Sequence, residues 1–448
     1  MAIRGDETTP LLKTPIPGPR AREVVAEDAK HLATTTKTAP LVAREGRGVV
    51  VEDLDGNRLL DFASGIGVTG TGHCHPRVVQ AIREQAGKLI HFAGTDFYYP
   101  QQVELAKRLG RIVPIRGATK TFYVQSGTEA NEAAIKVAKA ATGRHQFLAF
   151  LGAFHGRTLG ALSLTASKPR QRAGFFPTMP GAVHAPFPNP FRNVWGIDGY
   201  DEPDELANRA ISYIEGLLET ILPPQDLAAV FWEPVQGEGG YVVPPKPFPK
   251  MLRGLCDEHG ALLCADEVQT GFGRTGKWFA SEHFRVKSDT VQVAKAIASG
   301  YPLGACVMRA RLDFDRKGRH SNTFGGNVLG CTAAIATLDV MEKEELVANS
   351  ARMGKHLGKR LDEFAKQHER IGDHRGLGLM RALDFAKRNK AYDPKLRDAV
   401  EAAAWKRGLI LLGCGKSSLR IIPALNVTEE QIDGAMDVLG EALRAAKA

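Results

Sequence analysis

The segment Ser126-Gly127-Thr128-Glu129 combines residue types that can bind an anion at the start of a helix. It follows the apolar, strand-like residues 119–125 and precedes a helical stretch. Ser126 and Glu129 have the spacing of a capping box, and Gly127 allows the chain to turn tightly. The exposed N–H groups of such a helix start suit a phosphate group, although an ordinary capped helix would show the same pattern.

Two charged residues near the ends of later apolar segments add to this pattern. Asp266 lies near the end of residues 261–268, where a buried carboxylate needs a partner such as a protonated ring nitrogen. Lys295 directly follows residues 290–294, and a lysine in a closed apolar site loses its charge readily, which suits covalent chemistry with an aldehyde. Taken alone, Lys295 would more often be a surface lysine. Because ligands of open α/β sheets bind at the carboxyl ends of the strands, the three groups together predict a pyridoxal phosphate site.

The elements that must position these residues follow a βαβ pattern. From about residue 75 to residue 325, short apolar strands alternate with amphipathic helical stretches, as in a largely parallel sheet covered by helices. The strands expected in this part are residues 119–125, 145–151, 227–233, 261–268 and 290–294. Residues 184–204 are too rich in proline, glycine and asparagine for an element, so we expect a surface excursion there.

Both ends of the chain differ from this central part. Residues 1–45 are polar and punctuated by prolines, which indicates an arm that lies over a larger body. Residues 48–62 predict a hairpin around Asp55-Gly56. After about residue 328 the helical pattern dominates, which predicts a second, smaller α+β unit. The strands expected in that unit are residues 375–385, 408–413 and 418–426.

The composition excludes several classes of protein. With 448 residues, 43% hydrophobic and 24% charged, the chain can build at least two packed units and is not mainly disordered. The net charge of +9 is spread along the chain, and no basic block alternates with aromatic residues, so we expect no nucleic-acid partner. No uncharged apolar run approaches the length of a membrane span, so we expect no membrane partner. The cysteines are scattered and the first residues hold no apolar signal segment, so we expect reduced thiols and a cytoplasmic location.

Seven blocks in a fixed order resemble the class III aminotransferases, which depend on pyridoxal 5'-phosphate. They are SGTEANEAAIKVA, GAFHGRTLGALSLT, EPVQGEGG, ADEVQTGFGRTG, AKAIASGYPLGA, TFGGN and SLRIIP, and in spacing and order the resemblance covers about residues 40–440. The resemblance implies fold type I of these enzymes, the aspartate aminotransferase type. In this α/β fold a large domain with a mixed seven-stranded sheet is joined to a smaller α+β domain built from both chain ends.

The same resemblance implies a division of the chain and an assembly. Residues 1–70 would form the arm and part of the small domain, residues 71–328 the large cofactor-binding domain, and residues 329–448 the C-terminal small domain. Two chains would form a homodimer with the active sites at the interface, and the resemblance leaves open whether the dimers assemble further.

The resemblance also assigns roles to residues of the cofactor site. Lys295 would bond covalently to the cofactor and then act as general base and acid, and Asp266 would hold the proton of the pyridine ring. The other cofactor contacts would be Ser126, Gly127 and Thr128 on the phosphate, Thr323 on the phosphate in the partner subunit, Phe154 on the ring face, Val268 behind the ring, and Gln269 near the phenolic oxygen.

Four further positions match residues that select substrates in the family. Arg157 matches the residue that binds a carboxylate distant from the amine. Arg420 matches the residue that binds an α-carboxylate, and Glu238 matches the acid that masks it. An ω-amino donor has no carboxylate next to its amine, so Arg420 then needs another anionic partner. An ordinary Glu–Arg ion pair is the alternative interpretation. Ile66 matches the 4-aminobutyrate and acetylornithine aminotransferases, whereas ornithine aminotransferases tend to have tyrosine there.

We therefore expect an aminotransferase that moves the ω-amino group of 4-aminobutyrate, or a similar ω-amino acid, to 2-oxoglutarate, giving the semialdehyde and L-glutamate. Residues 186–209 resemble an archaeal and thermophile branch that also contains ornithine aminotransferases and amino-acid racemases. The alternatives are therefore an ornithine, lysine or acetylornithine aminotransferase, or a racemase on the same scaffold. The TFGGN block favours transamination.

Two other motifs point to different chemistry and are weaker. Residues 271–276 read G-x-G-x-x-G, as in a nicotinamide-dependent oxidoreductase, but no acidic residue follows about 20 positions later at the end of a second strand. The cluster His73-Cys74-His75 could suggest a metal. Adjacent ligands in a glycine-rich turn rarely form a closed tetrahedral site, so we expect no metal and a loop near the cofactor. A regulator without catalysis would lack one of the reactive groups, and all of them are present.

Overall fold

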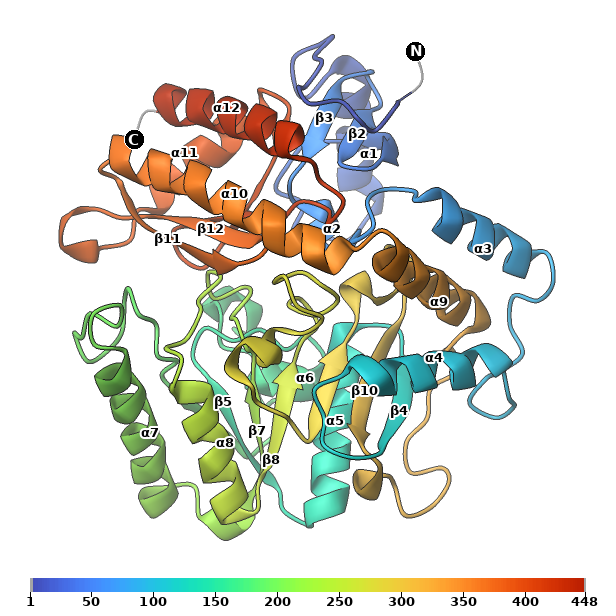
Figure 1. Ribbon diagram of the computed structural model, residues 1–448, viewed down its shortest axis with the longest axis vertical. Coiled ribbons are helices and arrows are strands. Elements are labelled where there is room, and N and C mark those ends of the chain that lie inside the picture. The colour runs from blue at the N-terminus through green and yellow to red at the C-terminus, as the bar shows by residue number, and fades with distance from the viewer. Residues whose placement is uncertain (1–2, 447–448) are drawn as a thin grey trace.

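The computed structural model describes residues 3–446, and its largest β-sheet forms the centre of the lower part of Figure 1. The strand order is β4-β10-β9-β8-β7-β5-β6, and β10 is antiparallel to both of its neighbours while the other pairs are parallel. These strands are β4 (Thr119–Val124), β5 (Gln146–Phe150), β6 (Ala182–Ala185), β7 (Leu227–Trp232), β8 (Leu262–Asp266), β9 (Thr290–Val293) and β10 (Gly304–Arg309). The expected mixed seven-stranded sheet is thereby confirmed.

Helices cover both faces of this sheet because its central strands are apolar on both sides. Along β5, Phe147 and Ala149 pack in one cluster with the buried alanines of α5 (Gly127–Thr142), whereas Leu148 and Phe150 pack in the cluster that holds the buried residues of α7 (Pro203–Thr220) and α8 (Phe248–His259). Alternate residues of a strand point to opposite faces, so one apolar strand serves two helical layers.

Two smaller sheets and the last helices form the upper part of Figure 1. The first sheet has the order β1-β2-β3-β13, and the second has the order β11-β12-β15-β14. Their strands are β1 (Ala43–Arg47), β2 (Val50–Asp53), β3 (Arg58–Asp61), β13 (Leu409–Ile410), β11 (Ile371–Leu377), β12 (Met380–Phe385), β15 (Ser418–Ile421) and β14 (Leu412–Cys414). Since β3 pairs with β13, segments from both ends of the chain share one sheet.

The remaining helices connect and cover these sheets. They are α1 (Pro19–His31), α2 (Ser64–Gly67), α3 (Pro76–Ala86), α4 (Pro100–Ile112), α6 (Leu159–Leu164), α9 (Val328–Lys343), α10 (Leu346–Gln367), α11 (Pro394–Trp405) and α12 (Glu429–Ala445). No helix within residues 3–446 is long and apolar enough to cross a membrane.

Several local expectations need correction. Strands β6 and β10 were not expected from the residues themselves, and β6 overlaps the start of the segment expected to hold no element. The stretch 375–385 is not one strand, because the chain turns at Gly378, which has a φ of 52°, and so separates β11 from β12. Strand β15 ends at Ile421, two residues before Pro423.

The N-terminal arm contains a helix and is anchored on the expected hairpin. Strands β2 and β3 pair antiparallel on either side of Asp55-Gly56, which confirms the hairpin. Asp55 accepts hydrogen bonds of 2.9 Å from the N–H groups of Arg20 and Ala21 at the start of α1. A carboxylate at a helix N-terminus satisfies free N–H groups there, so the turn of the hairpin caps the helix of the arm.

Candidate active site

A cavity of about 960 Å³ opens at the carboxyl ends of the strands of the large sheet. Its walls come from the turns that follow β4, β5, β7, β8 and β9, and from residues 397–420 of the C-terminal part. It is lined by twelve of the predicted site residues, namely Ile66, Ser126, Gly127, Thr128, Phe154, Arg157, Glu238, Asp266, Val268, Gln269, Lys295 and Arg420.

The start of α5 forms one wall of this cavity. Ser126 is the N-cap, and its Oγ accepts a hydrogen bond of 3.4 Å from the N–H of Glu129. The carboxylate of Glu129 in turn accepts from the N–H of Gln125 at 3.0 Å. The N–H groups of Gly127 and Thr128 in the first turn have no partner in the described part of the chain and can bind an anion, as at other helix starts.

Asp266, the last residue of β8, is held by three hydrogen-bonding groups. Its Oδ2 accepts a 2.8 Å bond from Asn131 Nδ2 and lies 2.8 Å from His155 Nδ1, while its Oδ1 accepts from the N–H of Val268 at 3.1 Å. Burial disfavours a charged imidazole, but the hydrogen bond and negative charge of Asp266 outweigh this and raise the pKa of His155. The carboxylate is therefore fixed in orientation at the cavity wall.

Lys295 follows β9, the strand next to β8, and its side chain is half-buried in the cavity lining. Its backbone has a φ of 38°, in the left-handed region, at the start of a 3-10 turn over Lys295–Ala298. Loss of hydration in the cavity lowers the pKa of the Lys295 amine, although the nearby carboxylates Asp266 and Glu238 oppose this change. A larger neutral fraction makes the amine a better nucleophile and base.

Arg420, Glu238 and Lys168 form a row of charges on another side of the cavity. Arg420 Nη2 lies 2.7 Å from Glu238 Oε1, and Lys168 Nζ lies 3.3 Å from Glu238 Oε2. Burial alone would raise the pKa of Glu238, but the two cations lower it to about 2. Arg420 Nη2 also donates to the carbonyl of Gly413 at 2.8 Å, whereas its buried Nε and Nη1 have no partner. Two of the three guanidinium nitrogens therefore have unmet hydrogen-bonding capacity.

Three other predicted site residues are exposed to solvent. The guanidinium of Arg157 is exposed and lies 5.8 Å from the centre of the Phe154 ring. Ile66 is 43% exposed, so its side chain projects into the opening rather than into the core. Thr323 is exposed and does not line this cavity. Its assigned role concerns the partner subunit and stays a prediction.

The polar residues that line the cavity and were not expected from the sequence include Asn131, His155, Lys168 and Glu233. Asn131 lies one helical turn after Gly127 in an alanine-rich helix, and a polar residue at that spacing is a signal that could have been used. His155 lies within the FHGRT segment, two residues before Arg157. Lys168 has no comparable signal, because its contact with Glu238 spans seventy residues of sequence.

The residues present fit pyridoxal phosphate. The start of α5 suits its phosphate, the fixed carboxylate of Asp266 suits a protonated ring nitrogen, and Lys295 supplies the amine for its aldehyde. Gln269 Oε1 is buried in the lining without a partner, so a polar ligand would satisfy it. Gly156 allows the loop after β5 to approach α5, since a Cβ there would lie 2.0 Å from Thr128 Oγ1.

Comparisons with known proteins agree with this geometry. The family model described as aminotransferase class-III matches residues 32–443. The chain belongs to the class III aminotransferases. These enzymes depend on pyridoxal phosphate, and the family therefore shows the cofactor of this one.

Relatives of this class III aminotransferase carry several functional names. It is 41% identical to an alanine/serine racemase of Pyrococcus horikoshii, with 96% of this chain and 91% of the relative covered. It is 40% identical to the acetylornithine aminotransferase of Methanosarcina mazei (94% and 96% covered) and 40% identical to the 4-aminobutyrate aminotransferase GabT of Escherichia coli (91% and 94% covered). A solved (S)-enantioselective omega-transaminase from Thermomicrobium roseum has a TM-score of 0.88 and 31% identity, with 96% of this chain and 99% of that chain covered.

The two motifs that suggested other chemistry do not form sites of that kind. Residues 271–276 do not begin a helix, as a dinucleotide-binding turn would, because only a 3-10 turn over Ala280–Phe284 follows. His73 and His75 contact different carboxylates, Asp61 at 2.7 Å and Glu344 at 3.0 Å, and neither lines the cavity.

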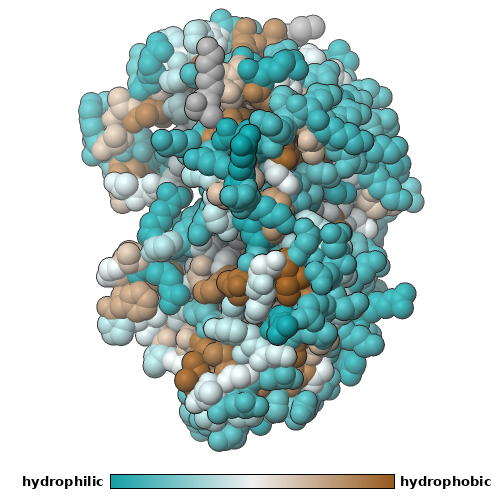
Figure 2. All heavy atoms as spheres, turned by 90° about the vertical axis from the view of Figure 1, so that its left-hand side faces the viewer, coloured by the Kyte–Doolittle hydropathy of each residue, from teal (hydrophilic) through white to brown (hydrophobic). Residues whose placement is uncertain are grey.

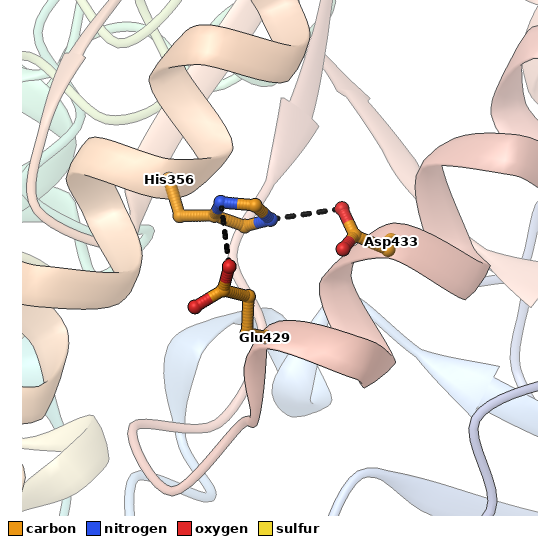
Figure 3. Close-up of side chains that lie close together, drawn as sticks. All are labelled: His356, Glu429 and Asp433. Atoms are coloured by element: carbon orange, nitrogen blue, oxygen red, sulfur yellow. Dashed lines mark hydrogen bonds and ion pairs between the residues drawn. The ribbon is translucent and has the colours of Figure 1, made fainter.

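Within residues 3–446, one group gathers the residue types of a metal site: His356, Glu429 and Asp433 (Figure 3). His356 Nδ1 lies 3.5 Å from Glu429, and His356 Nε2 lies 2.8 Å from Asp433. Both ring nitrogens of His356 already contact carboxylates, and Asp433 is also paired with Arg360, so the group is held together by its own charges. We interpret the group as an ionic link between α10 and α12.

Proposed function

We propose that this enzyme transfers the ω-amino group of 4-aminobutyrate, or of a similar ω-amino acid, to 2-oxoglutarate. The observation that carries this proposal is the buried Arg420, which is paired with Glu238 and retains two unpartnered nitrogens. An ω-amino donor brings no α-carboxylate, so Glu238 neutralises Arg420 while the donor reacts. 2-Oxoglutarate brings an α-carboxylate, which binds the guanidinium in a forked geometry.

Lys295 and Asp266 are proposed as the catalytic pair. When bound, pyridoxal phosphate supplies an electron sink that makes a proton on the substrate carbon acidic. The Nζ of Lys295 would remove this proton and return it to the cofactor carbon that carried the aldehyde, a role that its lowered pKa supports. Asp266 keeps the ring nitrogen protonated, and its bonds to Asn131 and His155 hold it in position.

Arg157 is proposed to bind the carboxylate at the far end of the substrate. Its guanidinium lines the cavity near Phe154, and no carboxylate in the described part of the chain pairs with it. Both 4-aminobutyrate and 2-oxoglutarate carry a distal carboxylate. One arginine can therefore serve both substrates, while Arg420 distinguishes them.

Racemisation is the second candidate function, because one relative at 41% identity bears the name alanine/serine racemase. A racemase would use the same Lys295 and Asp266 but would return the proton to the substrate carbon. Acetylornithine and 5-aminovalerate also occur among the substrates named for relatives, and both carry an amino group distant from a carboxylate.

We also propose a homodimer with Thr323 completing the phosphate site of the partner subunit. Exposed apolar residues support this: Ile90, Phe92, Phe97 and Tyr98 are between 50% and 88% exposed, and Phe324 beside Thr323 is 58% exposed. Ile90, Phe92, Phe97 and Tyr98 lie between α3 and α4, at the right of Figure 1, and the Phe324 ring packs 5.1 Å from His91 in the same segment. The opposite side, shown in Figure 2, is mainly hydrophilic with a few apolar patches. Apolar groups gathered in this way favour burial against another surface.

The division of the chain at residues 70 and 328, and the cytoplasmic location, are likewise proposed. All seven strands of the large sheet fall within residues 71–328, which supports the division. Five of the six free cysteines are buried and only Cys74 is exposed, which suits a reducing compartment.

The first test is the absorbance spectrum of the purified holoenzyme before and after 4-aminobutyrate is added without an oxo acid. We expect the spectrum of the cofactor's aldehyde form to change to that of its amine form, because the first half-reaction needs no acceptor. A spectrum that stays unchanged with 4-aminobutyrate but changes with ornithine would contradict the proposed donor. Interconversion of alanine enantiomers without an acceptor would favour the racemase.

The substitution Glu238→Ser tests the role of Arg420. Without the masking carboxylate, Arg420 stays available to α-carboxylates, so we expect the preference for L-glutamate over 4-aminobutyrate to rise roughly tenfold. The measurement is kcat/KM for the two donors in wild type and variant. An unchanged ratio would mean that Glu238 does not mask Arg420.

A further inference from the structure

We propose that Lys168 is a positioning residue that holds Glu238 whenever Arg420 binds a substrate carboxylate. This inference rests on the proposed function, since it concerns how one site accepts donors without an α-carboxylate and acceptors with one. It adds a second cation, Lys168, to the Arg420–Glu238 pair. Lys168 acts at the step in which Arg420 binds a substrate carboxylate.

The geometry separates the two cations on the same carboxylate. Glu238 uses Oε1 for Arg420 at 2.7 Å and Oε2 for Lys168 at 3.3 Å. The side chains are only 6% (Arg420), 16% (Glu238) and 21% (Lys168) exposed. Glu238 can therefore lose one partner without losing the other.

Glu238 needs a second cationic partner because an unpaired carboxylate is energetically costly when it is buried. When a substrate carboxylate takes Arg420, Glu238 must either move out to water or keep a cation. Lys168 meets this need because Glu238 is the one carboxylate that pairs with it within residues 3–446. No other described acid competes for the Lys168 amine.

The backbone around this pair is anchored, so only side chains need to move. The carbonyl of Glu238 accepts from the N–H of Gly415 at 2.8 Å, and the preceding Gly237 N–H donates to Glu233 at 3.1 Å. Lys168 caps the 3-10 turn Pro169–Gln171, and its carbonyl accepts from Gln171 N–H at 3.1 Å. Its flexible four-carbon side chain can follow Glu238 over a short distance.

Each carboxylate at Arg420 and Lys168 keeps a cationic partner in both halves of the reaction. With an ω-amino donor, Glu238 is shared by Arg420 and Lys168, as in the present structure. With 2-oxoglutarate, the α-carboxylate pairs with Arg420 and Glu238 pairs with Lys168, which gives two complete ion pairs. Without Lys168, binding of an α-carboxylate would leave Glu238 as an uncompensated anion.

The test uses single-turnover half-reactions of the holoenzyme, followed by cofactor absorbance, in wild type, Lys168→Met and Lys168→Arg. We expect Lys168→Met to lower the second-order rate constant of the amine form with 2-oxoglutarate more than that of the aldehyde form with 4-aminobutyrate. Loss of a charge-assisted contact of this kind should change the ratio of the two rate constants roughly tenfold. Lys168→Arg should restore the ratio, because an arginine keeps the charge. Pyruvate, which has an α-carboxylate but no distal one, should be weakened like 2-oxoglutarate.

The double variant Lys168→Met with Glu238→Gln provides the control. Once Glu238 is neutral it needs no holder, so removal of Lys168 should add nothing to the effect of Glu238→Gln on the 2-oxoglutarate reaction. An equal loss in both half-reactions with pyruvate unaffected would overturn the inference, because Lys168 would then bind the distal carboxylate directly. A wild type that reacts with neither 4-aminobutyrate nor 2-oxoglutarate would instead overturn the proposed function.

Discussion

At the scale of single residues, the proposed chemistry depends on charges that neighbouring groups set. Lys295 is a better base because its amine is held in a cavity where hydration is poor, and Glu238 stays ionised because two cations face it. His155 and Asn131 fix Asp266, although neither was identified from its residue type alone. Residue type thus gave the reactive groups, and the environment gives their protonation.

Replacement of Lys295 by alanine should abolish turnover. The variant lacks both the amine for covalent attachment and the base at the substrate carbon, so we expect kcat to fall by at least about 10³-fold. The cofactor should remain bound without a covalent link, which absorbance after gel filtration can report. Turnover close to that of wild type would contradict the catalytic role of Lys295.

Glu233 should make the stability of the folded protein depend on pH. Burial raises the pKa of this carboxyl from 4.5 to about 7, so between these values the folded state binds a proton that the unfolded chain releases. Stability should therefore fall as pH rises from about 4.5 to about 7. The glutamine in Glu233→Gln does not titrate. In this variant the free energy of unfolding should therefore lack the fall of about 3 kcal/mol that Glu233 causes over this pH range. Chemical unfolding of wild type and variant at several pH values provides the measurement, and parallel curves would contradict the prediction.

At the scale of elements, the site depends on how closely loops approach helix α5. The loop after β5 reaches the first turn of α5 at Gly156, whose φ is 140°. Thr128 Oγ1 lies 2.7 Å from Thr158 Oγ1 across this contact. The loop therefore joins the proposed phosphate site to the segment that carries Phe154 and Arg157.

Substitution of Gly156 by alanine should weaken cofactor binding. The added Cβ would lie 2.0 Å from Thr128 Oγ1 and would force the loop away from α5, so we expect at least a roughly tenfold loss of affinity for pyridoxal phosphate. Gly216 in α7 is the matched control, because a Cβ there meets nothing within 4 Å. Gly216→Ala should keep cofactor affinity and raise stability by up to about 1 kcal/mol. Unchanged cofactor affinity in Gly156→Ala would refute the close-approach argument.

At the scale of the whole molecule, segments distant in sequence meet at the cavity. Ile66, Lys295 and Arg420 come from three regions of the chain, and β3 and β13 join the N-terminal and C-terminal parts in one sheet. The apolar segment between α3 and α4 is exposed in the single chain. We therefore expect a second copy of the chain to cover it.

A charge placed in this apolar segment should disrupt the proposed dimer. We expect Ile90→Asp to shift the protein towards monomers in analytical ultracentrifugation, because Ile90 is 63% exposed here and would be buried in the dimer. Ile221, which is 60% exposed at the end of α7, serves as the control position, and Ile221→Asp should leave the assembly unchanged. Equal sedimentation of both variants would argue against an interface at residues 89–98.

The sequence by itself determined the fold class, the family and the order of the reactive groups along the chain. Blocks such as the helix start at Ser126 and the strand ends at Asp266 and Lys295 are local, so residue type and spacing suffice to recognise them. Strand β6 was missed because it has only four residues, three of them half-buried, so its pattern is weak. Strand β10 was missed because it is buried along nearly its whole length and shows no alternation of apolar and polar residues.

Only the tertiary structure decided which residues distant in sequence form hydrogen bonds and ion pairs. The contacts of Asp266 with Asn131 and His155 each span more than a hundred residues, and the contact of Lys168 with Glu238 spans seventy. Such contacts depend on the packing of helices and loops around the sheet, and no local spacing encodes them. The pKa of a buried group and the unpaired hydrogen-bond donors of Arg420 follow from that packing, because hydration and Coulomb interactions depend on distances in space.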